Sequence, residues 1–198
     1  MTILTAGFAD PVFDAQAVFR AVMMAMARPG EVRVITPELT PPAPLMPVTA
    51  ALALTLLDYE TPVWLDASLM AAPEVAEWLK FHTGARVTPE TDQAAFAIAG
   101  RPAVMPPLYA FALGTLEYPD RSTTLILQVD SLNGGNSLVL SGPGIKSAQV
   151  FSPERPPADF AKQLADNCAL FPRGVDVIFA APEGVAALPR SVKVIGES

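Results

Sequence analysis

The sequence predicts an α/β fold, a three-layer αβα sandwich around a mixed sheet. Segments with apolar residues at helical spacing alternate with short apolar runs that are typical of buried strands. No internal repeat or sharp change of composition divides the 198 residues. Hydrophobic residues make up 51% of the chain and charged residues 17%, so there is enough apolar surface to offset the entropy of ordering. We therefore expect one domain over residues 1–198.

The first segments predict helices joined by short strands. A helix is predicted over residues 14–27, because apolar residues follow one another at the spacing of one helical face, at Phe19, Val22, Met23 and Met26. This helix should end at Arg28-Pro29-Gly30. A proline-rich loop over residues 38–47 then leads into a buried helix over residues 48–57. After a polar turn, residues 62–65 suit a short strand.

The middle of the chain continues in the same way. Pro73 and Glu74 predict the start of a helix that runs to about Phe81 and ends at Thr83-Gly84. Residues 94–99 form the next candidate strand. Residues 108–113 are ambiguous between a helix and a strand.

Residues 123–130 and 137–140 predict an antiparallel hairpin. Between these two runs lies Asn133-Gly134-Gly135-Asn136, whose residues accept a positive φ. Apolar residues occupy both faces of the first run, so we expect it to be a central strand that is covered on both sides.

The last third of the chain predicts one helix and two strands. The helix lies around residues 160–168, where one side carries Phe160, Leu164, Ala165 and Cys168. Residues 175–180 and 192–195 are candidate strands.

Charge and composition argue against several classes of function. The net charge is −7 and no block of Lys and Arg offsets it, which disfavours nucleic-acid binding. The longest apolar stretch, residues 50–57, is far shorter than the roughly 18 residues that a membrane span needs. No basic residue precedes Arg20, so we do not expect a secretory signal. We therefore expect a cytoplasmic protein. Cys168 is the only cysteine and His82 the only histidine, which argues against a disulfide, a metal site or an iron-sulfur cluster.

Loop arginines are the candidate anion- or partner-binding residues. Each lies beside a proline or glycine turn, and their planar, multi-donor heads suit a phosphonate, a polyphosphate or a partner carboxylate; they are Arg121 with its neighbour Ser122, Arg173 and Arg190. The three arginines and the turn from Gly142 to Gly144 are predicted to lie near one another at a sheet end. The alternative is three unrelated structural salt bridges, which is the favoured interpretation for any single arginine.

Other motifs favour structural roles. The turn from Gly142 to Gly144 resembles a phosphate loop, but Ile145 separates Gly144 from Lys146-Ser147 and breaks the Walker spacing. A tight turn is the better interpretation, with a weak anion-binding nest as the alternative. His82 is expected to cap a helix, and Cys168 is expected to pack in the core. No residue stands out as catalytic.

Taken in order, segments along nearly the whole chain resemble PhnH, the H-subunit family of bacterial carbon-phosphorus lyase. The segments are Phe19-Arg20, Ala25 to Gly30, Leu56 to Trp64, Phe81 to Gly84, Arg121-Ser122, Leu140 to Ile145, Asn167, Phe171 to Asp176 and Leu188 to Arg190. Single motifs such as Gly142 to Ile145 are weakly specific, whereas the ordered set is strongly specific.

The resemblance implies a subunit of a core complex with subunits G, I and J that serves alkylphosphonate catabolism. In that pathway the G, H, I and L proteins convert ATP and methylphosphonate into α-D-ribose 1-methylphosphonate 5-triphosphate. The resemblance also implies a fold like that of pyridoxal-phosphate-dependent transferases without the cofactor, and a homodimer when isolated. No lysine stands in a recognisable pyridoxal-site context, so no cofactor is expected. Contact with ATP or a phosphonate ligand stays open.

Two functions from different classes therefore compete. The first is an accessory subunit that is required by a transferase but has no convincing catalytic residues of its own. The second is an independent enzyme or binding protein that uses the loop arginines on a small phosphorylated substrate. A chain so rich in apolar residues should also leave an apolar surface exposed, which favours a homodimer.

Overall fold

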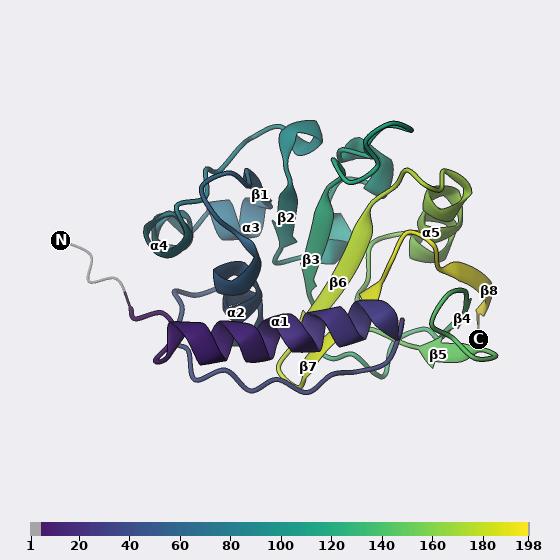
Figure 1. The fold of residues 1–198 in the computed structure, drawn as a ribbon, viewed down its shortest axis with the longest axis horizontal. Coiled ribbons are helices and arrows are strands. Elements are labelled where there is room, and N and C mark those ends of the chain that lie inside the picture. Colours follow the sequence, from purple (N-terminus) through teal and green to yellow (C-terminus); the bar gives the residue numbers. More distant parts are fainter. Residues whose placement is uncertain (1–4, 198) are drawn as a thin grey trace.

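A computed structural model describes residues 5–197 of the protein. The protein has an α/β fold built on a five-stranded mixed sheet (Figure 1). Four parallel strands come first, in the order β1 (Val63–Leu65), β2 (Phe96–Ala99), β3 (Thr124–Gln128) and β6 (Asp176–Ala181). The fifth, β7 (Gly184–Leu188), pairs with β6 in the antiparallel sense. The predicted α/β class with a mixed sheet is confirmed.

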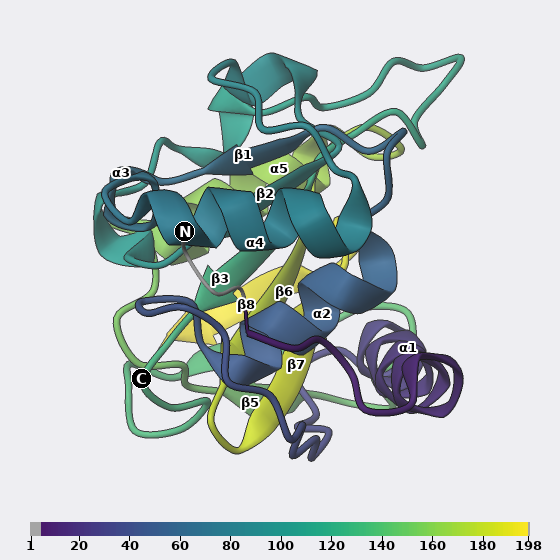
Figure 2. The ribbon, with the colours of Figure 1, turned by 90° about the vertical axis from the view of Figure 1, so that its left-hand side faces the viewer.

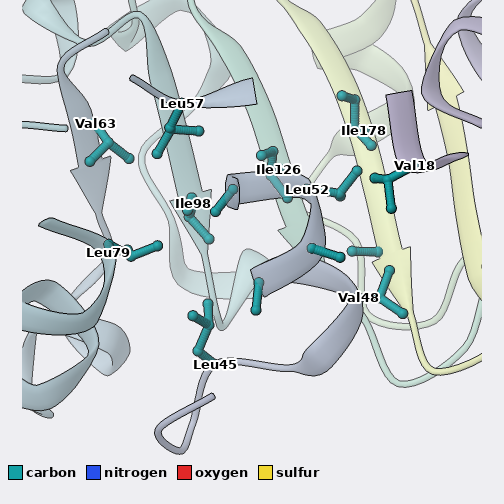
Figure 3. Packing of buried hydrophobic residues seen from close by; sticks show 14 of the residues in the cluster. Val18, Leu45, Val48, Leu52, Leu57, Val63, Leu79, Ile98, Ile126 and Ile178 are labelled. Carbon is teal, nitrogen blue, oxygen red and sulfur yellow. The ribbon is translucent and has the colours of Figure 1, made fainter. Parts of the chain in front are cut away.

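Helices cover one face of this sheet (Figure 2). They are α1 (Pro11–Ala27), α2 (Pro47–Leu56), the short α3 (Ala67–Met70) and α4 (Pro73–Thr83). Apolar side chains from these helices meet alternate residues of the strands, as Figure 3 shows for Val18, Leu52, Leu79, Ile98, Ile126 and Ile178. Alternation with a period of two is what a pleated strand imposes, so the residues between these strand positions point to the other face.

The opposite face packs against one helix and a second, smaller sheet. The helix is α5 (Phe160–Ala169). The small sheet is antiparallel, in the order β5 (Gln149–Phe151), β4 (Leu138–Ser141) and β8 (Lys193–Glu197). Phe179 of β6 contacts both the helix and the small sheet. Its ring lies edge-on to those of Phe151 and Phe160, with distances of 5.1 Å and 5.6 Å between ring centroids. One outer layer therefore combines a helix with strands.

β3 lies in the middle of the main sheet, and both of its faces are buried. Leu125 and Leu127 belong to the core under α5 and the small sheet, whereas Ile126 belongs to the core under α1, α2 and α4. The prediction of a central strand covered on both sides is confirmed.

The predicted hairpin between residues 123–130 and 137–140 is wrong. β3 pairs with β2 and β6, while β4 pairs with β5 and β8 in the other sheet. The glycine-rich link is a crossing loop. A Cβ on Gly135 would lie 2.0 Å from the carbonyl oxygen of Pro153, so this glycine allows close backbone contact with a distant segment. The same composition that favours a tight turn also favours such a contact.

The predicted helices are present, but the buried face of α1 differs from the expected one. α1 buries Val18, Val22 and Ala25, whereas Phe19 and Met23 are 50% and 53% exposed. The apolar residues of α1 thus occupy more than one side of the helix, so spacing alone does not identify which side faces the core. The ambiguous residues near position 108 form a single 3₁₀ turn, Leu108–Ala110.

Helix ends follow the expected chemistry. The Asp10 carboxylate accepts hydrogen bonds from the backbone N–H of Val12 and Phe13 at the start of α1. α4 ends at Gly84, whose φ of 74° is readily adopted by glycine. Within residues 5–197, no helix combines the length and the apolar character that crossing a membrane requires.

Glu183, in the turn between β6 and β7, fastens the segment that follows β3. Its carboxylate accepts hydrogen bonds from the Leu132 N–H at 2.7 Å and from the Ser131 hydroxyl at 3.0 Å. Partial burial on its own raises the pKa of Glu183. The hydrogen bonds from Leu132, from the backbone of Glu183 itself and from Ser131 outweigh that effect and hold the pKa below its ordinary value.

We predict that Glu183→Gln lowers the free energy of unfolding at pH 7 by about 1 kcal/mol, the scale of a partly exposed charge-assisted hydrogen bond. A lowered pKa stabilises the fold above the ordinary carboxylate pKa, and that stability is lost as pH falls through the lowered value. The gap between wild type and variant should therefore close in acid, as measured by urea denaturation across pH. Glu117→Gln, at an exposed position, is the control. An equal gap at every pH would contradict this role.

Candidate functional site

The predicted arginines and Ser122 lie at the amino end of the main sheet. Arg121 and Ser122 come just before β3, and Arg173 comes just before β6. β7 runs in the opposite direction, so Arg190, which follows it, reaches the same end; Leu188 is in register with Val177 near the start of β6.

Arg190 is held by other parts of the protein. Its guanidinium contacts both carboxylate oxygens of Asp176, with Nε 3.1 Å from Oδ1 and NH2 2.5 Å from Oδ2. The same side chain donates to the Ser122 hydroxyl at 2.5 Å and to the Pro119 carbonyl at 2.6 Å. The side chains of Arg190 and Asp176 are only 14% and 15% exposed. Arg190 therefore acts as a structural clamp that joins three loops, the alternative considered for each arginine.

Arg121 and Arg173 are held differently. The Arg121 guanidinium lies over the Tyr118 ring, 4.2 Å from its centroid. The Nε of Arg173 is buried, and no described residue offers it a hydrogen-bond partner. Neither arginine forms an ion pair within residues 5–197. These two cations thus keep their charge available at the amino end.

The glycine turn packs against backbone. Ile145 N–H donates to the Gly142 carbonyl at 3.1 Å, which closes a tight turn after β4. A Cβ on Gly144, whose φ is 84°, would lie 2.2 Å from the Ala27 carbonyl oxygen at the end of α1. A Cβ on Gly142 would meet the Ser191 carbonyl oxygen at 3.1 Å. The turn thus reaches the residue next to Arg190, while its nearest neighbours are not the side chains of the other two arginines.

His82 and Asn167 have structural contacts. His82 Nε2 lies 3.0 Å from the Thr5 carbonyl oxygen, and its ring lies 4.6 Å from that of Trp78. Asn167 is buried, donates to the Val175 carbonyl at 2.9 Å and accepts from the Val175 N–H at 2.8 Å. Asn167 thus ties α5 to the residue that precedes β6.

Sequence reasoning missed a cavity at the other end of the sheet. It has a volume of about 680 Å³ and lies outside the carboxyl ends of β1, β2 and β3. Each of these strands is followed by residues that line it, Asp66 after β1, Arg101 after β2 and Asp130 after β3. In α/β sheets, ligands commonly bind beyond the carboxyl ends of parallel strands. Charged residues within two positions of the ends of three apolar strands were the sequence signal for it.

The chain is thus an α/β protein with two polar sheet ends, one closed by the Arg190 clamp and one that holds a cavity. Comparisons with known proteins show its family. The family model described as bacterial phosphonate metabolism protein (PhnH) matches residues 6–195. A protein of Rhizobium meliloti (strain 1021), named alpha-D-ribose 1-methylphosphonate 5-triphosphate synthase subunit PhnH, is 47% identical over 192 residues, covering 97% of this chain and 96% of the relative. The chain belongs to the PhnH family, so the resemblance inferred from its sequence is confirmed.

A second relative matches in part. The putative C-P lyase subunit protein HtxG of Stutzerimonas stutzeri is 37% identical over 82 residues, which cover 41% of this chain and 42% of that protein.

We predict that Arg190→Ala lowers the free energy of unfolding by about 3 kcal/mol, because it leaves the Asp176 carboxylate buried without its partner. Arg121→Ala should cost at most about 1 kcal/mol, the scale of an exposed cation-π contact. Urea denaturation at neutral pH measures both values. Equal, small losses in the two variants would show that Arg190 is not a clamp.

Proposed function

We propose that this chain is the H subunit of a carbon-phosphorus lyase core complex in alkylphosphonate catabolism. In this role it is required for forming α-D-ribose 1-methylphosphonate 5-triphosphate from ATP and methylphosphonate, together with its partner subunits. The observation that carries the proposal is the 47% identity to a named synthase subunit over almost the full length of both chains. The partial match to a putative C-P lyase subunit agrees with it.

Within this proposal the chain is an accessory subunit that acts with subunits G, I and J in the cytoplasm, where ATP is available. The tight packing of the arginine clamp and the glycine turn supports an accessory role, because these motifs serve the fold. A relation to the fold of pyridoxal-phosphate-dependent transferases, without their cofactor, is part of the same proposal and is supported by the mixed α/β sheet.

Growth tests the proposal directly. A bacterium that lacks its own H-subunit gene should regain growth on methylphosphonate as the sole phosphorus source when it expresses this chain. A tagged copy should also bring down subunits G, I and J. Failure of both would contradict the proposal, and turnover of ATP with methylphosphonate by the purified chain alone would favour the independent enzyme.

We also propose that Arg121 and Arg173 contact an anion or an acidic surface of a partner. Both cations lie at the amino end of the sheet without an ion-pair partner among the described residues. Arg190 and Ser122 contribute by holding the loops in place, and Gly142 and Gly144 by bringing the small sheet against the end of α1.

The double variant Arg121→Ala/Arg173→Ala should weaken growth on methylphosphonate while its midpoint of urea denaturation stays close to that of wild type. Arg86→Ala, at an exposed position in another loop, is the matched control and should leave growth unchanged. Full growth of the double variant would contradict a binding role.

For the homodimer, we propose that two copies meet through the exposed side of α1. This stripe is formed by Val12, Phe13, Phe19, Met23 and Met24, which are 43% to 73% exposed. α1 contains one acidic and one basic residue, Asp14 and Arg20, so the helix is neutral although the whole chain carries −7. Two neutral apolar stripes related by a two-fold axis can pair without charge repulsion.

The double variant Phe19→Asp/Met23→Asp should convert the dimer into a monomer, because four carboxylates would then face one another across the axis. Sedimentation velocity at micromolar concentration measures the change. Leu116→Asp, at another exposed apolar residue, is the matched control and should stay dimeric. A monomeric wild type or a dimeric double variant would refute this interface.

A further inference from the structure

The cavity at the carboxyl ends of β1, β2 and β3 has walls that are fixed before any ligand binds. Asp66 is 5% exposed, and its carboxylate accepts hydrogen bonds from the Leu69 N–H at 3.0 Å, the Ser68 hydroxyl at 2.7 Å and the Arg101 N–H at 2.8 Å. It therefore ties α3 to the loop after β2. A Cβ on Gly100 would meet the Ser68 hydroxyl at 2.6 Å, so glycine is needed for this close approach.

A second buried side chain fixes the opposite wall. Gln128, at the end of β3, accepts a hydrogen bond from the Met46 N–H at 2.8 Å and donates to the Pro44 carbonyl at 3.2 Å. Both ends of this amide are used in binding the loop that precedes α2. Side chains held in this way give a site that does not have to order itself around a ligand, which lowers the entropic cost of binding.

The charges inside the cavity leave one cation available. Asp66 is surrounded by its three donors, and Asp130 forms an ion pair with Arg155 at 3.0 Å on the rim. Arg101 is exposed and lines both this cavity and an adjoining one of about 410 Å³. Within residues 5–197 its guanidinium has no hydrogen-bond or ion-pair partner; its backbone N–H makes the bond to Asp66.

The remaining lining is apolar and includes an aromatic ring. It consists of Pro44, Met46, Trp64, Ala67, Ala71, Val104, Met105 and Pro106. A mostly apolar cavity with a few fixed polar groups is typical of small-molecule sites. One unpaired arginine at its edge favours a single anionic head, and a polyphosphate would add several negative charges next to Asp130 in a protein of net charge −7.

We propose that this cavity binds a small organic phosphonate or phosphate monoester, with its tetrahedral oxyanion on Arg101 and its apolar substituent against Trp64, Met46 and Val104. The choice of a phosphonate head over a carboxylate rests on the proposed function, while the need for one anionic head and an apolar body comes from the cavity. The site is separate from Arg121 and Arg173, which lie at the amino end of the same sheet.

Calorimetric titration of the purified chain with butylphosphonate tests this proposal. The expected result is saturable binding that Arg101→Ala weakens by about tenfold or more, the effect of losing charge-assisted hydrogen bonds to an anion. Val104→Glu should also weaken binding, because it adds a negative charge to the cavity and leaves Arg101 in place. Both side chains are exposed, so both variants should fold. Arg86→Ala is the matched control and should bind like wild type.

Four ligands then separate the contributions. Butylphosphonate should bind more tightly than inorganic phosphate, which lacks the apolar body, than pentanoate, which carries a carboxylate head, and than ATP, which carries more charge. Absence of saturable binding at millimolar butylphosphonate, tighter binding of ATP or pentanoate, or unchanged binding by Arg101→Ala would overturn the proposal. Binding without restored growth would contradict the proposed function alone, and restored growth without binding would contradict this inference alone.

Discussion

The structure depends on the burial of the central strands on both faces. β3 and β6 contribute large apolar side chains to two separate cores, so neither strand has a face left for contact with water. Strands of this kind gain their stability from packing, which is non-directional and does not determine where the loops at their ends lie. The loops are instead positioned by a few polar side chains at the strand ends, each of which bonds to backbone or to an opposite charge.

This division of roles gives the two ends of the sheet different properties. At the amino end, the ion pair between Arg190 and Asp176 is nearly buried and joins the loops before β3 and β6 to the end of β7. At the carboxyl end, Asp66, Gln128 and Glu183 bond mainly to backbone N–H and hydroxyl groups. Those of Asp66 and Gln128 fix the segments on either side of the cavity at this end. The hollow end is therefore the better place for a small ligand.

Local signals in the sequence predicted most of the elements but not how they pair. The predicted helix end at Gly84 rests on capping, and the predicted strand at residues 175–180 rests on an apolar run. Both signals act over a few residues. β7 was not predicted, because residues 184–188 mix small and larger apolar residues without alternation, and they form a strand through their pairing with β6. The false hairpin has the same cause, since a glycine-rich link does not reveal whether its flanking strands share a sheet.

The candidate site was predictable only as a list of loop arginines. That three of them would gather at one end follows from strand direction, but the burial of Arg190 against Asp176 depends on residues that are 14 apart in the chain. Arg101 was not among the predicted site residues, because its significance comes from the cavity around it and not from its neighbours in sequence.

We propose that this chain supports the synthase as a subunit and has no turnover of its own. Adenine release from ATP and methylphosphonate by reconstituted subunits G, I and L, with and without this chain, tests it most directly. The account predicts release only when all four proteins are present and none from this chain alone. Equal adenine release without this chain, or release by this chain alone, would contradict it.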